Sequence, residues 1–124
     1  MTQEAVTYIG EVLSGLGLNY TFDEWHEKTI PDTYFTGTYI EHPSTTREES
    51  GYEESTFIIR GYTRLTRLAL EQALDSIKHA FPITTLLPSG SAIAIFYDTA
   101  DMVPQPGGAR KSIKINLNVQ EWRV

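Results

Sequence analysis

Residues 34–81 constrain the fold more than any other part of the chain, because they place two strand-like runs and a helical run in a fixed order. Aromatic and β-branched residues dominate residues 34–40, which predicts a strand. Residues 43–51 lack apolar periodicity and predict a long hairpin loop, and residues 54–62 predict the partner strand. This segment therefore predicts a β-hairpin followed by a helix.

The predicted helix runs from its cap at Thr63 to Ala80, because the Thr63 hydroxyl can accept a hydrogen bond from an unpaired amide of the first turn. Phe81 precedes Pro82, and the residue before a proline is disfavoured in the α conformation, so we expect the helix to end there. The apolar residues recur with helical spacing and predict one buried face: Leu65, Leu68, Ala69, Ala73, Leu74, Ile77 and Phe81.

The flanking segments complete the prediction. Helical periodicity indicates a helix over residues 4–16, and alternation indicates a strand over residues 18–22 that continues towards Trp25. Residues 91–98 form a compact apolar run, expected as a central strand, and residues 113–120 alternate strictly between apolar and polar. The order α-β-β-β-α-β-β predicts an α+β fold: a single domain over residues 1–124 with one mainly antiparallel sheet and two helices on one face.

The composition argues against several classes of function. The chain of 124 residues has 40% hydrophobic residues, and its 16 acidic against 10 basic residues give a formal net charge of −6. This acidity argues against broad binding to nucleic-acid phosphates. The absence of cysteine excludes disulfides and thiolate metal sites. We expect a soluble cytosolic protein with no signal peptide and no membrane span, since the longest apolar run is far shorter than the ~20 residues required.

No residue pattern predicts catalysis, a cofactor or a metal. His26, His42 and His79 are far apart and lack metal-ligand spacing, so we expect no metal. Asp98 and Asp101 are paired carboxylates at the end of a predicted strand, but aspartates more often shape such loops than act in catalysis. Nucleophile-elbow, phosphate-loop and dinucleotide motifs are also absent from the sequence. We therefore predict that the chain is not an enzyme, with an enzyme using the two aspartates as a weaker alternative.

The charged segment after the second strand permits two interpretations. It contains Arg47, Glu48, Glu49, Tyr52, Glu53 and Glu54. Such a run is either a solvated surface or a protein-recognition loop, since a long loop held by two strands reaches a neighbour and Tyr and Arg are favoured at interfaces.

The run Tyr34-Phe35-Thr36-Gly37-Thr38-Tyr39, the acidic loop, the run from Ser55 to Gly61 and the helix that follows resemble the tail terminator family of long-tailed bacteriophages. The resemblance spans nearly the whole chain. It implies a small α+β subunit that forms a hexameric ring at the head-proximal end of the virion tail after assembly in the host cytoplasm. The ring would stop tail tube polymerisation and bind the head-tail connector protein, and genome DNA would pass through it without specific binding.

The resemblance also implies that the segments 43–54 and 99–110 contact neighbouring subunits, the tail tube protein or the connector. The expected interaction residues are Arg47, Glu48, Glu49, Tyr52, Glu53, Glu54, Asp101 and Arg110. Two alternatives remain open. One is a head-completion protein or other minor tail protein of related fold. The other is a small-ligand-binding regulatory α+β module, which requires convergent polar groups in an apolar pocket.

Overall fold

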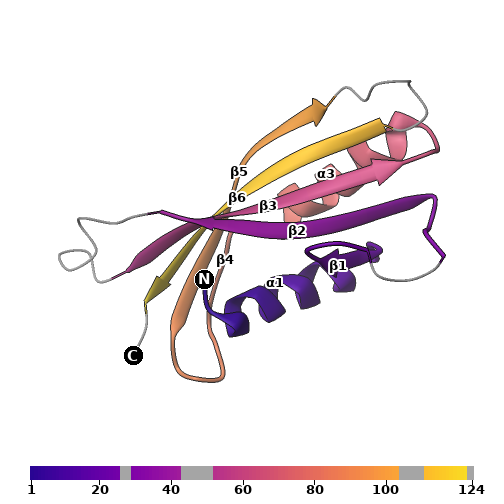
Figure 1. The fold of residues 1–124 in the computed structure, drawn as a ribbon. Coiled ribbons are helices and arrows are strands. Elements are labelled where there is room, and N and C mark those ends of the chain that lie inside the picture. The colour runs from indigo at the N-terminus through magenta and orange to yellow at the C-terminus, as the bar shows by residue number, and fades with distance from the viewer. Residues whose placement is uncertain (26–28, 43–51, 104–110, 123–124) are drawn as a thin grey trace.

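The computed structural model describes residues 1–25, 29–42, 52–103 and 111–122. Within these residues the strands form a six-stranded sheet in the order β1-β2-β3-β6-β5-β4 (Figure 1). Neighbouring strands are antiparallel except β1 and β2, which are parallel. The elements are α1 (Gln3–Gly15), β1 (Tyr20–Phe22), β2 (Thr33–Glu41), β3 (Glu53–Thr63), α3 (Arg67–Ala80), β4 (Ile83–Leu86), β5 (Ala92–Val103) and β6 (Lys111–Trp122).

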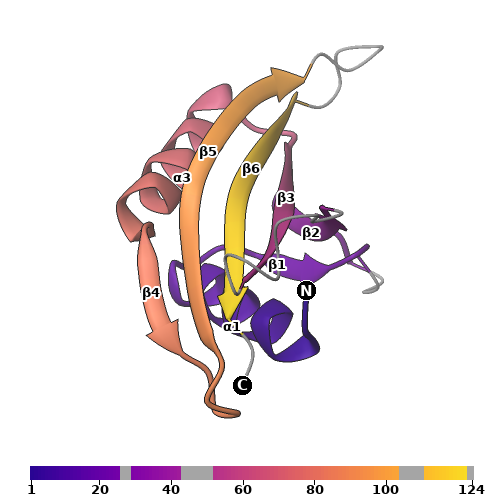
Figure 2. The same ribbon diagram turned by 90° about the vertical axis from the view of Figure 1, so that its left-hand side faces the viewer.

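This architecture confirms the predicted α+β fold and its order of elements, to which the structure adds the short strand β4. One hydrophobic core joins both helices to one face of the sheet. It includes Ile9 and Leu13 from α1, Leu70 and Ile77 from α3, and Leu117 from β6, each at most 2% exposed. Figure 2 shows β5 and β6 bending together along their length, with α3 beside them.

Strict alternation sets the two faces of the sheet. In β6, Ile113 and Ile115 are buried against the helices, whereas Lys114 and Asn116 point to the opposite face. We call this second face the outer face. Among the described residues, α1 and α3 both pack on the core face, so the outer face is not covered by either helix.

A buried carboxylate fixes the start of α1 against the last strand. Glu121 of β6 is 2% exposed, and it accepts hydrogen bonds from the Thr2 hydroxyl at 2.9 Å and the Thr2 backbone N–H at 3.2 Å. Thr2 is the N-cap of α1, because its hydroxyl accepts a hydrogen bond from the Ala5 N–H at 3.2 Å. The two ends of the described chain are thus held together, which positions α1 under the sheet.

The predicted start of the second helix was wrong. Thr63 is the last residue of β3 and contacts Thr33 through its hydroxyl, and the helix begins at Arg67 with Thr66 as N-cap. This later start places Leu65 outside the helix, where it is 51% exposed, and Leu68 is 55% exposed. The face that packs on the sheet consists instead of Leu70, Ala73 and Ile77, at helical spacing.

The predictions for the second half of the sheet were partly wrong. Strand β5 does not end at Asp98 but continues to Val103, so residues 99–103 of the expected 99–110 loop belong to the strand. Its ladder with β6 shifts at Asp98: Tyr97 lies opposite Leu117, whereas Thr99 lies opposite Asn116. Asp98 is therefore an extra residue, a β-bulge. In addition β3 and β6 hold the middle of the sheet, with β5 next to the edge strand β4.

In the parts of the chain that the structure describes, neither helix is long and apolar enough to cross a membrane. Helices α1 and α3 have 13 and 14 residues.

Candidate functional site

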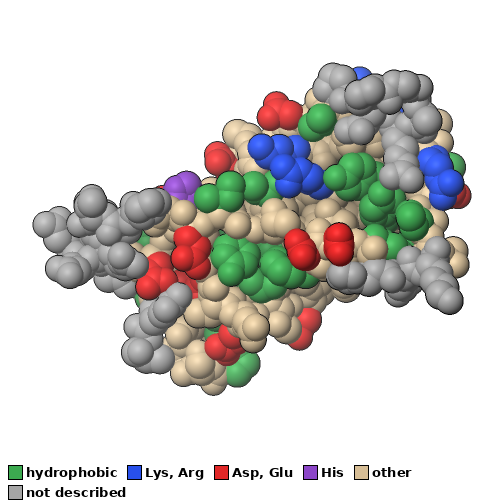
Figure 3. Space-filling view, viewed as in Figure 1, with side chains coloured by type: hydrophobic (Ala, Val, Ile, Leu, Met, Phe, Trp, Pro, Cys, Tyr) green, Lys and Arg blue, Asp and Glu red, His purple; other side chains and the backbone are tan. Residues whose placement is uncertain are grey.

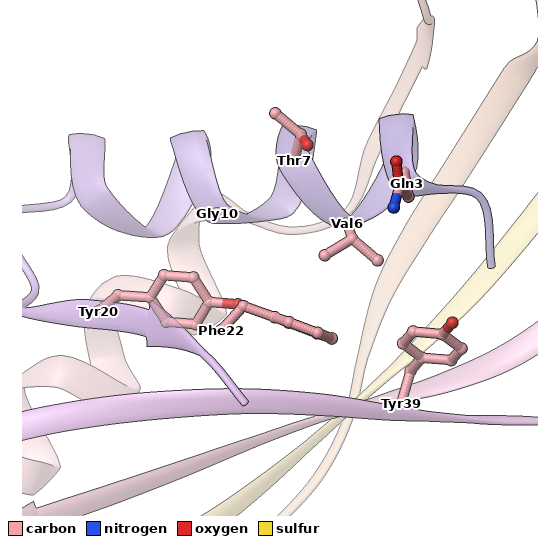
Figure 4. A pocket seen from close by; sticks show the side chains of 7 residues that line it. All are labelled: Gln3, Val6, Thr7, Gly10, Tyr20, Phe22 and Tyr39. Atoms are coloured by element: carbon pink, nitrogen blue, oxygen red, sulfur yellow. The ribbon is translucent and has the colours of Figure 1, made fainter. Parts of the chain in front are cut away.

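A groove opens between α1 and the strands β1 and β2 (Figure 4). Its volume is about 440 Å³. Val6 points from the helix towards the aromatic rings that the two strands contribute, whereas Thr7 points away from them. The lining residues are Gln3, Val6, Thr7, Gly10, Tyr20, Phe22 and Tyr39.

Two glycines make room for the Tyr20 side chain at the base of the groove. A Cβ on Gly10 of α1 would lie 3.2 Å from Tyr20 Cε2, and a Cβ on Gly37 of β2 would lie 2.6 Å from the Tyr20 hydroxyl oxygen. The second distance is shorter than any normal contact, so only glycine fits at position 37 with the tyrosine in place. The absence of both side chains allows the Tyr20 ring to lie between helix and sheet.

The Tyr20 hydroxyl is the polar group at the base of this groove. Its oxygen is buried and has no hydrogen-bond partner among the described residues. Burial raises the pKa of Tyr20 well above its usual value, because the phenolate would lose its hydration. At neutral pH the hydroxyl therefore stays protonated.

The mouth of the groove is apolar and aromatic. Phe22 and Tyr39 stack with their ring centroids 6.2 Å apart, and their side chains are 38% and 36% exposed. Val6 of α1 is half-buried against the core beside them. The groove therefore offers apolar contact area around a single buried donor, an arrangement that suits a ligand or a protein side chain.

The backbone edge of β2 runs along the same groove. Strand β1 pairs only with residues 35–37 of β2, so within the described residues no strand continues this pairing along residues 38–40. Odd-numbered residues of β2 direct their backbone groups away from β3. The Phe35 N–H donates to the Asn19 carbonyl, and the Gly37 carbonyl accepts from the Asp23 N–H. By the same alternation the N–H and C=O of Tyr39 face the open edge.

The opposite edge of the sheet is β4. It pairs with β5 on one side, and no strand of the described residues lies on its other side. The bond from Leu87 N–H to the Ser91 carbonyl continues the β4–β5 ladder, so odd-numbered residues bond to β5 and Thr84 and Leu86 direct their backbone groups outward. Leu86 is the most exposed large hydrophobic residue described, at 71%.

The space-filling view shows exposed hydrophobic side chains among acidic ones on the β2 side of the molecule (Figure 3). Ile40 of β2 is 58% exposed. By its register it lies on the outer face of the sheet, like Ile58 and unlike Phe57 of β3, which packs in the core.

The predicted interaction residues fall at two separate ends of the sheet. Tyr52 packs on Trp122 with ring centroids 5.3 Å apart, and Glu53 and Glu54 follow in β3. Asp101 lies in β5 opposite Lys114. Because Glu54 and Asp101 lie opposite β6 residues six positions apart, the two groups are separated by roughly 20 Å along the strand direction. Arg47, Glu48, Glu49 and Arg110 lie outside the described residues.

The structure places the candidate chemical residues apart from one another. His42 Nε2 lies 2.6 Å from the Thr56 hydroxyl, and His79 Nδ1 lies 2.8 Å from the Asp75 carbonyl oxygen, whereas His26 lies outside the described residues. Among residues that the structure describes, no three His, Cys, Asp or Glu side chains gather closely enough to hold a metal ion. Asp98 occupies the bulge, so the two aspartates are strand residues and do not form the rim of a loop.

Sequence reasoning missed the groove and the two open edges. A glycine within an aromatic strand, Gly37, and a glycine within a helix, Gly10, were the available signals. Each indicates a close approach of another group, but their common partner Tyr20 follows only from the packing.

Comparison with known proteins yields a likeness of fold. No family model matches the chain, and no curated protein matches it. Among solved structures, a chain from the virion of a native gene transfer agent particle superimposes with a TM-score of 0.72 at 15% identity, over 96% of this chain and 93% of that one. A second solved structure, whose name states no activity, gives a TM-score of 0.67 at 16% identity, over 98% and 96%. At these identities the likeness establishes a shared α+β fold over nearly the full length of each chain.

Proposed function

We propose that this chain is a structural subunit of a virion and, more specifically, a tail terminator that caps the tail tube as a ring. The observation that carries this proposal is the shared fold with a chain of the gene transfer agent virion, which covers 96% of this chain and 93% of that one. Coverage of both chains from end to end means that the likeness extends to the whole domain and not to a common supersecondary motif.

The proposed mechanism is geometric and requires no catalysis. A ring of identical subunits joined head to tail leaves no unpaired subunit within the circle, while its two faces differ and can bind different proteins. One face would end the tail tube and the other would bind the head-tail connector. The net charge of −6 supports this proposal, because DNA that passes through the ring must not be held by its phosphates.

The decisive experiment measures assembly in the presence and absence of tail tube protein. Light scattering and negative-stain electron microscopy across a range of protein concentrations should show six-fold rings, and addition of the chain to polymerising tube protein should shorten the tubes and cap one end. A monomer or dimer that leaves tube length unchanged would contradict the proposal. Binding to the connector without any effect on tubes would favour a head-completion protein.

The groove supports a second candidate, a small-ligand-binding module. Its volume of about 440 Å³ lies in the range of ligand pockets, and the Tyr20 hydroxyl supplies a buried donor without a partner in the described residues. A panel of small aromatic ketones and carboxylates, screened by thermal shift, tests this candidate. A compound that raises the melting temperature of the wild type but not of Tyr20→Phe would support it, and a panel with no such compound would remove it.

A further inference from the structure

The two open edges of the sheet are complementary to each other. We propose that residues 38–40 of β2 in one subunit pair with β4 of the next subunit, so that the sheet continues from copy to copy around the ring. This inference rests on the proposed ring function and names the contact that closes it.

The backbone supplies the first argument. Strand β4 has four residues and pairs with a strand on one side only, and within the described residues 38–40 of β2 likewise pair with β3 alone. On β4 the outward groups belong to Thr84 and Leu86, and on β2 the N–H and C=O of Tyr39 face outward over the groove. Two short edges with outward backbone groups can form a ladder by strand addition.

Side chains supply the second argument. Ile40 and Leu86 are 58% and 71% exposed, the two highest values among the exposed large hydrophobic residues described. Both lie on the outer face, because Ile40 shares the face of Ile58 and Leu86 lies opposite Ala92, on the face away from Ile93 and the core. Pairing of the two edges would bring these side chains to one face, where each can cover the other.

The lack of edge protection supplies the third argument. Soluble proteins usually block aggregation at an edge strand with charges, proline or a bulge. Strand β4 reads Ile-Thr-Thr-Leu and contains none of these within its span, and its ladder with β5 is regular. An unprotected edge of this kind is expected for a strand that another subunit covers in the assembled ring.

The chemistry of the edges favours a second copy in head-to-tail contact. Pairing of β2 with β2 across a two-fold axis would produce a closed dimer and leave Leu86 exposed on both subunits. Pairing of β2 with β4 uses the open part of β2 beyond β1 and the edge of β4 in every subunit, and it closes a ring when the rotation between neighbours divides a full turn. The contact is therefore heterologous, as the proposed function requires.

Cysteine cross-linking tests the pairing directly, because the chain contains no cysteine of its own. Ile40→Cys and Leu86→Cys are prepared as separate full-length proteins. After mild oxidation we expect disulfide dimers in the mixture of the two variants and essentially none in either variant alone. The double variant should yield a ladder of covalent oligomers that ends at the ring. Dimers within the Ile40→Cys sample alone would overturn the proposal in favour of two-fold pairing.

A backbone substitution gives an independent readout. Tyr39→Pro removes an N–H that points to the open edge and leaves the ladder with β3 intact. Tyr39→Thr is the control, because it removes the aromatic side chain and keeps the N–H. We expect Tyr39→Pro to weaken subunit association by about tenfold more than Tyr39→Thr, with both proteins folded by circular dichroism. Equal association of the two variants would overturn the edge pairing.

The outcomes separate this inference from the proposed function. Wild-type rings that cap tubes, together with an absence of cross-links in the mixture, would refute the edge pairing and leave the terminator function standing. A wild-type chain that forms no oligomer with or without tube protein would refute both.

Discussion

Replacement of Tyr20 by phenylalanine should stabilise the protein. The Tyr20 hydroxyl oxygen is buried and has no hydrogen-bond partner among the described residues, and an unsatisfied buried polar group costs about 1–3 kcal/mol. Phenylalanine keeps the ring that fills the space between Gly10 and Gly37 and removes only the hydroxyl. We therefore expect Tyr20→Phe to raise the free energy of unfolding by about 1–2 kcal/mol, which for a domain of this size corresponds to a melting temperature higher by roughly 3–8 °C.

Urea denaturation at pH 7 measures the change, with Tyr39→Phe as the matched control. Tyr39 lines the same groove but is 36% exposed, so removal of its hydroxyl relieves no burial cost and should change stability by less than about 0.5 kcal/mol. The midpoint of unfolding should rise in Tyr20→Phe, with an unchanged dependence on urea concentration, because the core is otherwise the same.

The same variant predicts a difference at alkaline pH. Burial raises the pKa of Tyr20 in the folded protein, whereas the unfolded chain has the ordinary value of about 10. The wild type therefore loses stability as the pH rises above about 10, because the tyrosine then ionises in the unfolded chain while it stays protonated in the folded protein. Tyr20→Phe lacks this loss, so its advantage over the wild type should grow above pH 10. A variant less stable than the wild type at pH 7 would refute the reasoning and show that the hydroxyl has a bound partner.

Three further substitutions or deletions test other parts of the structure. Gly37→Ala should lower the free energy of unfolding by about 1–3 kcal/mol in urea, because its Cβ would lie 2.6 Å from the Tyr20 hydroxyl oxygen, whereas Gly15→Ala, with no atom within 4 Å, should be neutral or slightly stabilising. Glu121→Gln should destabilise by about 1–3 kcal/mol and speed hydrogen exchange in the first turn of α1, and unchanged exchange there would contradict the role of Glu121. Deletion of residues 45–50, which lie outside the described residues, should preserve the circular dichroism spectrum and impair ring or tube binding; intact assembly would reduce the loop to a solvated hairpin.

The elements with long periodic patterns were predictable from the sequence, and the short or shifted ones were not. Strand β6 alternates between apolar and polar residues over 113–120, so local residue chemistry alone predicts most of it. Strand β4 has four residues, and its place depends on pairing with β5, which no local pattern encodes. Thr63 carried a plausible capping hydroxyl, but its burial at 1% exposure against Thr33 extends the strand and delays the helix. In this case tertiary packing determined the boundary.

The candidate site was less predictable than the fold, for a physical reason. The acidic segment stood out because charge is visible residue by residue, and its described members Tyr52, Glu53 and Glu54 lie at one end of β3. The groove around Tyr20 brings together residues from α1, β1 and β2 that have ordinary compositions. The groove depends on the lack of a side chain at Gly10 and Gly37 and on a Tyr20 hydroxyl without a hydrogen-bond partner among the described residues. These features become visible only when the three elements are packed together.

The extra residue at Asp98 sets the phase of the second half of β5. Before it, Ile95 and Tyr97 face the helices, and after it Ala100 and Met102 do so, while Asp101 and Val103 face outward. Loss of one residue at this point would exchange the two sets and direct the Asp101 carboxylate into the core. Related chains should therefore tolerate many substitutions between 97 and 99 but keep the length of this stretch. A chain with a different length there should also have its apolar and polar positions exchanged in the part of β5 that follows.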